Sequence, residues 1–420
     1  MHLPLICCCV FGCSKQSDKS PAEHSVGSNV EPEAIQVAPD DDTVTARESA
    51  PPDDPSSVAA QPQNSKNVVT TIRVFYGTDR RPTGSATPNE FYGGSRGKLS
   101  VGFCDVSLPP NHKRGELEAP SIWRFEFRDN PDRHVVLRNV QPVDGATFLN
   151  NLKTTIAASV REVAHGREVR ELGGELFVFV HGFNVTFKDA ARRTAQMAHD
   201  LEFPGAPVMF SWPSLGKGSP SGYREDERTA EWCEDDVMDF VTVVAKQSGA
   251  RRVHLIAHST GNRVLTGVLR RLAYSKRSGD MPKFNEVILT APDIDAETFK
   301  LAIAPRITGI ADRFTVYASK NDVALQASSA LHADGTRLGQ GGSYLTSFPQ
   351  FPKIDMIDAS DVDTSLFAIN HSYYGDSPTV LNDISNVLIG AKVESRGLKT
   401  LAPRTAWRVP ERLARITRWQ

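Results

Sequence analysis

The feature that most constrains this chain is a short apolar run, residues 253–257, that leads into a serine set among small residues. A run of this kind is typical of a buried strand, and the amphipathic pattern of residues 262–274 directly after it is typical of a helix. Only a tight turn fits between the two, with Ser259 at its apex. The sequence therefore predicts a strand–turn–helix unit that holds a serine hydroxyl above the carboxyl end of a sheet.

The residues around Ser259 are small, as such a turn requires. The spacing Ala257-x-Ser259-x-Gly261 differs from the G-x-S-x-G of a nucleophile elbow only at its first position, where alanine is the mildest departure from glycine. In an elbow, the backbone N–H of the next residue, here Thr260, faces a developing oxyanion. A serine beside a glycine is more often an ordinary turn. The strand before it and the helix after it favour the catalytic interpretation.

Alternating strand and helix patterns extend over residues 69–391. Residues 176–180 form an apolar run without alternation, as expected of a strand buried on both faces. Repeated strand–helix units with such strands predict the α/β class, with a mainly parallel central sheet covered by helices on both faces. The strands before residue 144 are expected to pair antiparallel. Further strands are expected at residues 69–77, 99–108, 123–127, 135–143, 208–212, 286–290, 313–318 and 353–358, and helices from Asp144 and at 187–201, 226–247, 297–304 and 379–389.

The two ends of the chain differ in composition from this domain. Residues 14–68 contain ten acidic and four basic residues and no aromatic residue, so they bury too little apolar surface to fold and are predicted to be a disordered linker. Residues 392–420 form a basic C-terminal tail with eight basic and two acidic residues. From Pro410 its pattern allows a small amphipathic helix against an anionic membrane surface, although a solvated or domain-docked tail is the commoner arrangement.

Residues 1–13 form a short apolar leader that ends in Val10-Phe11-Gly12-Cys13. This ending resembles the lipobox of bacterial lipoprotein signal peptides, which implies an exported protein attached to a membrane of the bacterial envelope through Cys13. Phe11 is bulky for its position, and no Lys or Arg precedes the apolar run. The alternative is an unprocessed N-terminus with a metal- or redox-prone cysteine cluster in a cytoplasmic protein.

The net charge and the cysteine content of the chain limit which classes of partner and which covalent cross-links are expected. The chain has 420 residues, 23% of them charged, and its net charge of −2 gives no reason to expect a nucleic-acid partner. No run reaches the roughly 18 apolar residues of a membrane-spanning helix. Outside the leader only Cys104 and Cys233 remain, too few for a disulfide framework, and both are expected to be buried apolar side chains. The sequence carries no signal for an oligomeric state.

A serine hydroxyl needs a base to remove its proton and a carboxylate to orient that base. On a sheet of this type the three side chains follow the order serine, acid, histidine along the chain. Only His332 and His371 follow Ser259. His371 lies between the last expected strand and the last expected helix and is the predicted base. His332, in a Gly/Ser-rich loop, is the alternative.

Asp322 is the predicted acid, because it lies in the loop after the strand at 313–318, where this architecture usually places its carboxylate. Asp293 and Asp295 follow the preceding strand and are the alternatives. All three aspartates also suit a helix N-terminus, where aspartate caps backbone N–H groups. The sequence therefore ranks Asp322 first and leaves a purely structural role open for each.

The strand at 176–180 ends in His181-Gly182-Phe183-Asn184. A His-Gly-x turn at this place offers a backbone N–H, here that of Phe183, to pair with the N–H of Thr260 in an oxyanion hole. His181 itself is expected to shape the loop by hydrogen bonding rather than to transfer protons.

Six segments carry a resemblance to a known superfamily. They read YGTDR at 76–80, FVHGFN at 179–184, FSWPS at 210–214, LIAHSTGN at 255–262, APDID at 291–295 and Asn-His at 370–371. These motifs are similar to those of an esterase- or lipase-like bacterial branch of the α/β-hydrolases. The resemblance covers residues 69–391. It implies the α/β-hydrolase fold and a catalytic triad of Ser259, Asp322 and His371, but it supplies no substrate.

These residues predict a serine hydrolase that cleaves a carboxylic ester of a small or lipid-like molecule through an acyl-enzyme intermediate. The chemistry needs no metal or organic cofactor, and the chain contains no metal-ligand spacing or phosphate-binding glycine loop. An acyltransferase would use the same site. From another class, an envelope-anchored binding or scaffold protein without activity would keep the fold. The intact set of Ser259, Asp322 and His371 favours the enzyme.

Overall fold

The computed structural model describes residues 69–121, 126, 128–165, 168–275, 281–332, 335–348, 351, 353–362, 372–402 and 405–415. The leader with Cys13, the linker at 14–68, most of the strand expected at 123–127 and the predicted base His371 lie outside the described residues. The backbone of His332 is described, but its side chain is not. Of the helices in the described ranges, none is long and apolar enough to cross a bilayer.

The described strands form one large sheet and one separate hairpin. The hairpin consists of β4 (Arg161–His165) and β5 (Glu168–Leu172). The large sheet contains β1 (Thr70–Pro82), β2 (Tyr92–Leu108), β3 (Val136–Val143), β6 (Glu175–Val180), β7 (Gly205–Ser211), β8 (Arg252–His258), β9 (Phe284–Thr290), β10 (Ala311–Ala318), β11 (Ile354–Asp358), β12 (Lys399–Ala402) and β13 (Ala406–Arg408).

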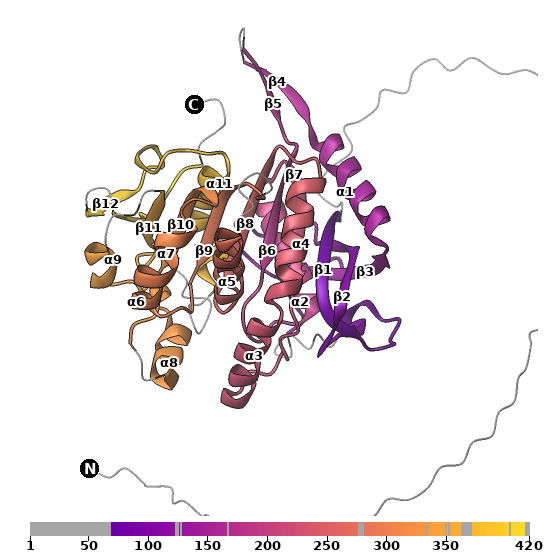
Figure 1. Cartoon of the computed structure of the whole chain (residues 1–420). Helices are drawn as coiled ribbons and strands as arrows, with labels where there is room; N and C mark the ends of the chain where they lie inside the picture. Colours follow the sequence, from indigo (N-terminus) through magenta and orange to yellow (C-terminus); the bar gives the residue numbers. More distant parts are fainter. Residues whose placement is uncertain are drawn as a thin grey trace, which may run out of the picture. The chain divides into compact units, whose positions relative to one another are not determined.

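The strand order of the large sheet is β12-β13-β11-β10-β9-β8-β6-β7-β1-β2-β3 (Figure 1). From β1 through β7, β6, β8, β9, β10 and β11 to β13, every neighbouring pair is parallel. At one edge β1, β2 and β3 pair antiparallel, and at the other edge β12 pairs antiparallel with β13. The mainly parallel sheet and the antiparallel pairing of the first strands are as predicted from the sequence.

Helices connect these strands and cover both faces of the sheet (Figure 1). Short helical turns occur at η2 (Pro88–Glu90), η4 (Phe299–Ile303), η5 (Leu338–Gln340) and η6 (Val393–Ser395). The α-helices are α1 (Gly145–Ser159), α2 (Phe187–Asp200), α3 (Pro220–Trp232), α4 (Glu234–Gln247), α5 (Gly261–Tyr274), α6 (Ala296–Thr298), α7 (Ala304–Ile307), α8 (Val323–His332), α9 (Ser343–Ser347), α10 (Tyr373–Asp376) and α11 (Pro378–Leu388).

The central strand β6 shows how the sheet divides the core. All six of its residues are buried. Because side chains alternate along a strand, Leu176, Val178 and Val180 pack on one face with apolar residues of α1, α4 and α5. Phe177 and Phe179 pack on the other face with residues of α2 and α11. The continuous apolar run of β6 therefore reflects burial on both faces.

The long helix expected at 226–247 is instead two helices, α3 and α4, divided at Cys233. The helix α3 begins earlier than expected, because Ser219 accepts a hydrogen bond of 3.1 Å from the backbone N–H of Gly222 and Pro220 suits a first turn. The first turn of α4 carries three acidic residues, which stabilise a new helix N-terminus.

The C-terminal stretch adds two strands to the sheet. The strand β13 pairs in parallel with β11, and β12 pairs with β13. The sheet thus continues past residue 391, the end of the domain expected from the sequence. These two strands were not expected because they are short and lie in a polar, basic stretch with little apolar pattern. The described residues after β13 contain no helix. Instead, Arg415 donates a 2.7 Å hydrogen bond to the carbonyl of Leu201 and pairs with Glu202, which docks this segment beside the end of α2.

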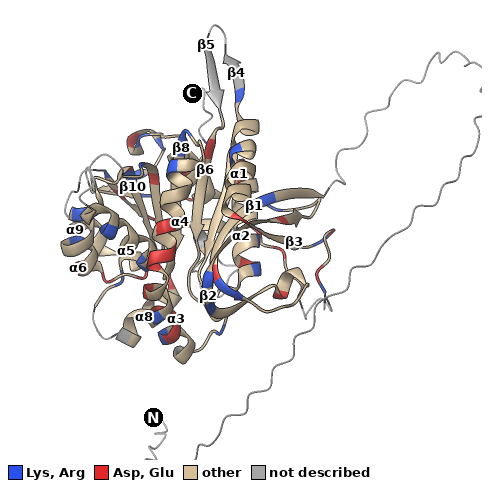
Figure 2. Ribbon diagram, turned by 45° about the vertical axis from the view of Figure 1, so that its right-hand side comes forward, with Lys and Arg blue, Asp and Glu red and all other residues tan. Residues whose placement is uncertain are grey.

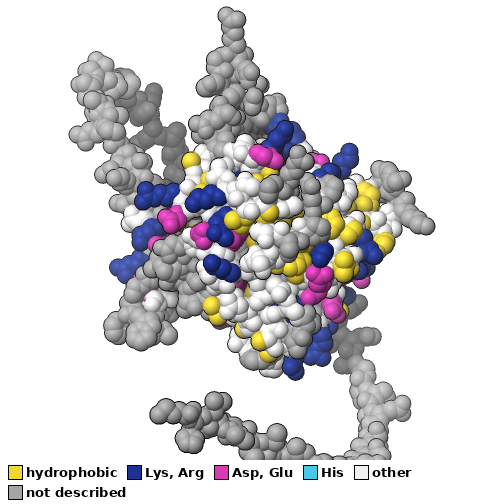
Figure 3. Space-filling model, turned by 90° about the vertical axis from the view of Figure 1, so that its left-hand side faces the viewer, with side chains coloured by type: hydrophobic (Ala, Val, Ile, Leu, Met, Phe, Trp, Pro, Cys, Tyr) yellow, Lys and Arg dark blue, Asp and Glu magenta, His cyan; other side chains and the backbone are white. Residues whose placement is uncertain are grey.

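Charged side chains of both signs are interspersed over the surface. Figure 2 shows Lys and Arg next to Asp and Glu along several helices, and Figure 3 shows the same mixture on the face that it views. Neither of these views shows a block of one sign, in keeping with a net charge of −2.

Candidate active site

Ser259 lies at the turn between β8 and α5, as the sequence predicts. Its backbone φ is 52°, in the left-handed region that residues other than glycine rarely adopt. The N–H of Ser259 donates to the carbonyl of Thr290 at 3.1 Å, and the Asn262 amide nitrogen donates to the carbonyls of Ser259 and Thr290, both at 3.0 Å. These bonds hold the strained turn to the end of the neighbouring strand β9.

Close packing of two glycines explains why small residues surround Ser259. A Cβ atom on Gly182 would lie 2.7 Å from the Cβ of Ser259, and one on Gly261 would lie 2.4 Å from the carbonyl oxygen of His181. Both contacts are shorter than real Cβ atoms allow. The turn after β6 and the turn after β8 are therefore pressed together, which brings Phe183 and Thr260 to the same end of the sheet.

The backbone N–H groups of Phe183 and Thr260 are the predicted oxyanion donors. Neither makes a backbone hydrogen bond within the described ranges, although Arg263 and other residues of the following turn do. Thr260 is fully buried, and Ser259 is only 5% exposed. The role of the two N–H groups as oxyanion donors stays a prediction.

His181 shapes this loop, as expected from the sequence. Its Nδ1 lies 2.8 Å from the carbonyl oxygen of Gly182 and therefore donates a proton to it. The ring stacks on Trp212 at 5.1 Å, and the indole N–H of Trp212 donates to the His181 carbonyl at 2.7 Å. Burial, and then the nearby Arg80, lowers the pKa of His181 to about 3. The imidazole is therefore neutral at ordinary pH and acts as a structural group.

Arg80 is a second residue that organises the loop, and no pattern in the sequence indicates this role. Its guanidinium is almost fully buried and donates to the carbonyls of Gly93 and Ser214, both at 3.0 Å, and of Val185 at 2.7 Å. It also donates to the Ser211 hydroxyl at 2.9 Å. The only sequence signal was the segment at 76–80, since these partners come from distant parts of the chain.

Asp322 lies directly after β10, in the loop where the sequence places the acid. It is fully buried, and its Oδ1 accepts the N–H of Leu325 at 3.0 Å at the start of α8. The N–H of Asp322 donates to Ser319, and Asn321 is tied to the carbonyl of Ser360 beyond β11. The carboxylate is thus fixed at the carboxyl edge of the sheet and also caps a helix.

The alternative acids have other partners. Asp295 caps α6 by accepting the N–H of Thr298 at 2.6 Å. Asp293 is buried, and its carboxylate accepts hydrogen bonds from the hydroxyls of Tyr223 and Ser328. Burial alone would raise the pKa of Asp293, but Arg263 and these hydroxyls bring it below its usual value. Asp293 therefore serves as the centre of a polar network beside Ser259.

A cavity of about 390 Å³ opens at Ser259. One wall is the face of α8, which is mostly apolar. The other wall comes from the loop after β6 and from α3, where the ring of Phe183 lies 5.2 Å from that of Tyr223. Figure 1 shows α3 and α8 at the same end of the molecule. The lining residues are Phe183, Asn184, Gly218, Ser219, Tyr223, Ser259, Asp293, Ala324, Leu325, Ala327, Ser328 and Leu331.

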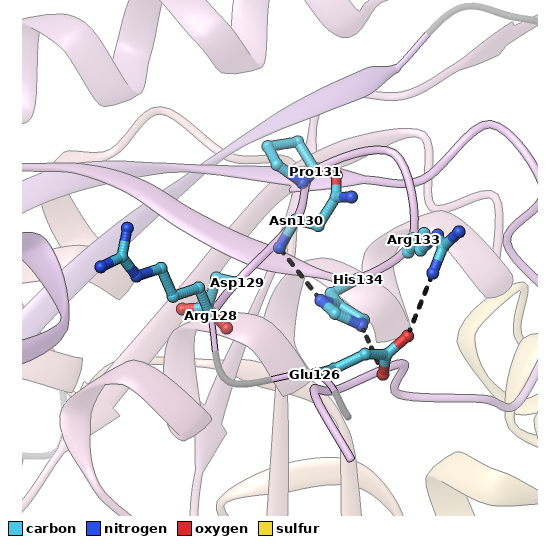
Figure 4. A pocket seen from close by; sticks show the side chains of 7 residues that line it. All are labelled: Glu126, Arg128, Asp129, Asn130, Pro131, Arg133 and His134. Atoms are coloured by element: carbon cyan, nitrogen blue, oxygen red, sulfur yellow. Dashed lines mark hydrogen bonds and ion pairs between the residues drawn. The ribbon is translucent and has the colours of Figure 1, made fainter. Parts of the chain in front are cut away.

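A second hollow, of about 530 Å³, lies in the connection between β2 and β3 and is lined by the residues that Figure 4 labels. His134 is held on both sides: its Nδ1 accepts the N–H of Asn130 at 3.0 Å, and its Nε2 lies 3.1 Å from Glu126, which also pairs with Arg133. None of the seven labelled residues is a serine, threonine or cysteine. The cavity at Ser259 is therefore the better candidate for covalent chemistry.

The two described cysteines are buried and free, as expected from the sequence. Burial raises the pKa of both Cys104 and Cys233, so neither is a thiolate nucleophile. Within the described ranges, the histidines and carboxylates close enough to bind one metal ion together are His112, His199 and Asp200, which do not line the Ser259 cavity.

Comparison with known proteins places this geometry in a family. A model of the alpha/beta hydrolases of unknown function (DUF900) matches residues 157–392, more than half of the chain. No curated protein sequence matches it.

Three solved structures, each 13% identical, match part of the chain. A gene product of Listeria innocua has a TM-score of 0.32 over 56% of this chain and 98% of that one. An uncharacterised protein from Capnocytophaga ochracea has a TM-score of 0.31 over 58% and 69%. Phospholipase PlaB from Legionella pneumophila has a TM-score of 0.23 over 49% and 43%. Superpositions this partial do not bear on the substrate.

Proposed function

Because the chain belongs to a family of α/β hydrolases of unknown function, we propose that it is a serine hydrolase that cleaves a carboxylic ester at Ser259. The observation that carries the proposal is the left-handed backbone of Ser259 at the end of β8, on the wall of a cavity. A left-handed residue other than glycine costs roughly 1–2 kcal/mol. Such strain persists at functional sites because the surrounding structure imposes it.

The proposed reaction assigns a task to each of the predicted groups. The Ser259 hydroxyl attacks the ester carbonyl while His371 takes its proton, and the carbonyl oxygen becomes an anion that accepts hydrogen bonds from the N–H groups of Phe183 and Thr260. His371 then gives the proton to the leaving alcohol as the C–O bond breaks. Water, deprotonated by His371, attacks the acyl-enzyme, and the proton passes to Ser259 as the carboxylic acid leaves.

Asp322 is the proposed partner of His371. Its place after β10 is where this fold presents its acid, and its buried carboxylate is held by the cap on Leu325. Asp293 is less suited to the task, because hydroxyls of α3 and α8 and the guanidinium groups of Arg263 and Arg337 already surround it. We assign Asp293 to the support of the cavity.

The lining of the cavity favours an apolar acyl group. Ala324, Ala327 and Leu331 recur at helical spacing on the face of α8 that lines the cavity, and their small or apolar side chains leave a slot beside Ser259. Leu331, at the far end of α8, is 46% exposed, so the slot leads outward from the serine toward solvent. An acyl chain lying along α8 would bury apolar surface on both partners.

The test is hydrolysis of p-nitrophenyl esters from acetate to palmitate by the full-length chain, together with labelling by a fluorophosphonate. We expect labelling and hydrolysis in the natural protein and neither in Ser259→Ala. His371→Ala should lose hydrolysis, whereas His332→Ala, the matched control, should keep it.

The outcomes separate the alternatives. Labelling without hydrolysis, with acyl transfer to an added alcohol, would indicate an acyltransferase. A folded protein that is neither labelled nor active would favour the inactive scaffold. Hydrolysis that survives in His371→Ala and is lost in His332→Ala would reverse the assignment of the base.

We also propose attachment to the envelope through Cys13, which rests on the sequence of the leader alone. The test is fractionation of cells that produce Cys13→Ser, with Cys9→Ser as the matched control. The expected result is release from the membrane fraction in Cys13→Ser only. Equal membrane retention of both variants would refute lipidation at Cys13.

A further inference from the structure

A compact group of histidines and carboxylates lies outside the Ser259 site, where the segment after β2 meets the end of α2. His112 comes from that segment, and His199 and Asp200 are the last residues of α2. The Nε2 of His112 is 2.9 Å from the Oδ1 of Asp200, and the Nδ1 of His199 is 3.2 Å from the same oxygen. All three atoms lie within 4.8 Å of one another.

The surrounding groups aim these three atoms at a common point. Glu118 lies 2.8 Å from the Nδ1 of His112, which fixes the ring and turns its Nε2 toward Asp200. The second oxygen of Asp200 accepts the N–H of Gly115 at 2.7 Å and the amide of Gln196 at 2.5 Å. The oxygen Oδ1 is therefore the one that faces both histidines.

This arrangement has the form of a metal site with its supporting shell. Histidines that bind a metal through one ring nitrogen usually donate the other ring N–H to a carboxylate or carbonyl, as His112 does to Glu118. Metal–ligand bonds of about 2.0–2.1 Å in a tetrahedron place neighbouring ligand atoms roughly 3.3 Å apart. The observed 2.9 and 3.2 Å are close to that separation.

We infer that His112, His199 and Asp200 form a zinc site that ties the segment after β2 to the end of α2. Two imidazoles and one carboxylate suit zinc, whereas magnesium and calcium prefer oxygen ligands alone. The fourth position faces solvent beside His199, whose side chain is 39% exposed. The site is structural, because its ligands join two segments and do not line the cavity at Ser259.

A second histidine–carboxylate pair, also in the connection between β2 and β3, shows how an ion pair differs from the proposed zinc site. His134 also contacts a glutamate, Glu126, but its other nitrogen accepts a backbone N–H from Asn130. Both ring nitrogens of His134 are thus used within the chain, and no metal-binding group among the described residues includes it. The two histidine–carboxylate contacts of His112 alone would make an ion pair, and His199 is the ligand that distinguishes a zinc site from an ion pair.

The experiment titrates zinc into the metal-free full-length protein, followed by calorimetry and by thermal unfolding. We expect one zinc ion per chain and a raised melting temperature. His199→Asn removes a ligand but keeps the contact between His112 and Asp200, so the protein should fold and lose the binding. Glu118→Gln should weaken binding roughly 10–100-fold, as outer-shell changes do.

A matched control lies two residues from Glu118. Among the described residues, Glu116 pairs with the exposed Lys113 and does not contact the three ligands, so Glu116→Gln should bind zinc like the natural protein. Cobalt in place of zinc separates this site from the cysteines of the leader, because only thiolate ligands give a cobalt–sulfur charge-transfer band. Absence of binding in the natural protein, or equal binding in His199→Asn, would overturn the proposal and leave an ion pair only.

Discussion

Burial disfavours the charged form of ionisable groups in two regions of this molecule, but it decides the outcome in only one of them. In β1 and in the loop after β6, burial dominates: it lowers the pKa of His181 to about 3 and raises that of Asp79 to about 7. In the cluster at the end of α2, burial opposes the charged form of His112, but hydrogen bonds to Asp200 and Glu118 outweigh it and raise the pKa to about 9. His181 and Asp79 are thus held in or near their neutral form, whereas the cluster holds charges.

The difference follows from what each group contacts. Neither carboxyl oxygen of Asp79 has a hydrogen-bond partner within the described residues, and His181 has a guanidinium rather than a carboxylate beside it. His112 lies between two carboxylates. Burial raises the pKa of both, but hydrogen bonds, those to His112 first, outweigh it and bring both values below their usual range. Backbone packing therefore determines the geometry at Ser259, whereas charge determines the geometry of the cluster.

We expect the largest effect on activity from a change at Asp322, the carboxylate whose charge the proposed mechanism requires. Asp322→Asn keeps the shape but removes the charge that orients His371, and we expect kcat for ester hydrolysis to fall roughly 10⁴-fold, as in serine proteases. Asp295→Asn is the control, because Asn also caps helices, and it should keep the activity and the melting temperature. Nearly full activity in Asp322→Asn would move the acid elsewhere.

The next effect concerns the buried carboxyl of Asp79. In the unfolded chain it ionises near its ordinary pKa of about 3.9, so the folded state binds more protons above that pH. Asp79 therefore stabilises the folded state most below about pH 4. This stabilisation is lost as the pH rises through 7, which lowers the free energy of unfolding by at most about 4 kcal/mol.

Asp79→Asn removes this titration. Urea unfolding at pH 4.5, 6 and 8 should show the variant gaining stability relative to the natural protein as the pH rises. A difference that stays constant with pH would mean that Asp79 is not held in its neutral form, and the contrast between the two regions would fail.

A third prediction tests backbone packing. The Cβ of Gly182→Ala would press on Ser259, and we expect kcat/KM to fall roughly 10²-fold, the effect of losing one oxyanion donor, together with about 1–3 kcal/mol of stability. Gly309→Ala is the control, because a Cβ there meets nothing within 4 Å. Equal activity in the two variants would show that the turns after β6 and β8 are not as closely packed as described.

The smallest expected effect concerns the slot along α8. Ala327→Phe fills it, so the ratio of kcat/KM for the octanoate ester to that for the acetate ester should fall roughly tenfold. Val323→Phe, on the exposed side of the same helix, should leave the ratio unchanged. A ratio that Ala327→Phe does not change would mean that the acyl chain lies elsewhere, while the role of Ser259 would stand.

The difference between the turn at Ser259 and the cluster at the end of α2 also explains which features could be predicted from the sequence. The turn at Ser259 is encoded by neighbouring residues whose apolar run, small residues and helical pattern are all local, so both the fold class and the serine could be recognised. The cluster joins His112 to a residue 88 positions away, and Arg80 reaches carbonyls over more than 100 positions. Such contacts form only when the chain folds, so no spacing of residues in the sequence predicts them.

Local patterns also failed where they were weak. The strands β12 and β13 are short and polar, and the start of α8 was hidden because the stretch around it looked like a loop. Asp322 caps α8, which is the structural alternative that the sequence left open, and its role as the acid stays a prediction. Helix capping and catalysis both select aspartate at a loop end, so the sequence alone does not separate them.

The most direct test of the central claim is the rate of p-nitrophenyl butyrate hydrolysis by the full-length protein and by Ser259→Ala, with folding checked by circular dichroism. The account predicts a rate well above the buffer reaction for the natural protein and a loss of more than roughly 10³-fold in a folded Ser259→Ala. Equal rates for the two proteins would contradict it, because the strained serine at the end of β8 would then not be the nucleophile.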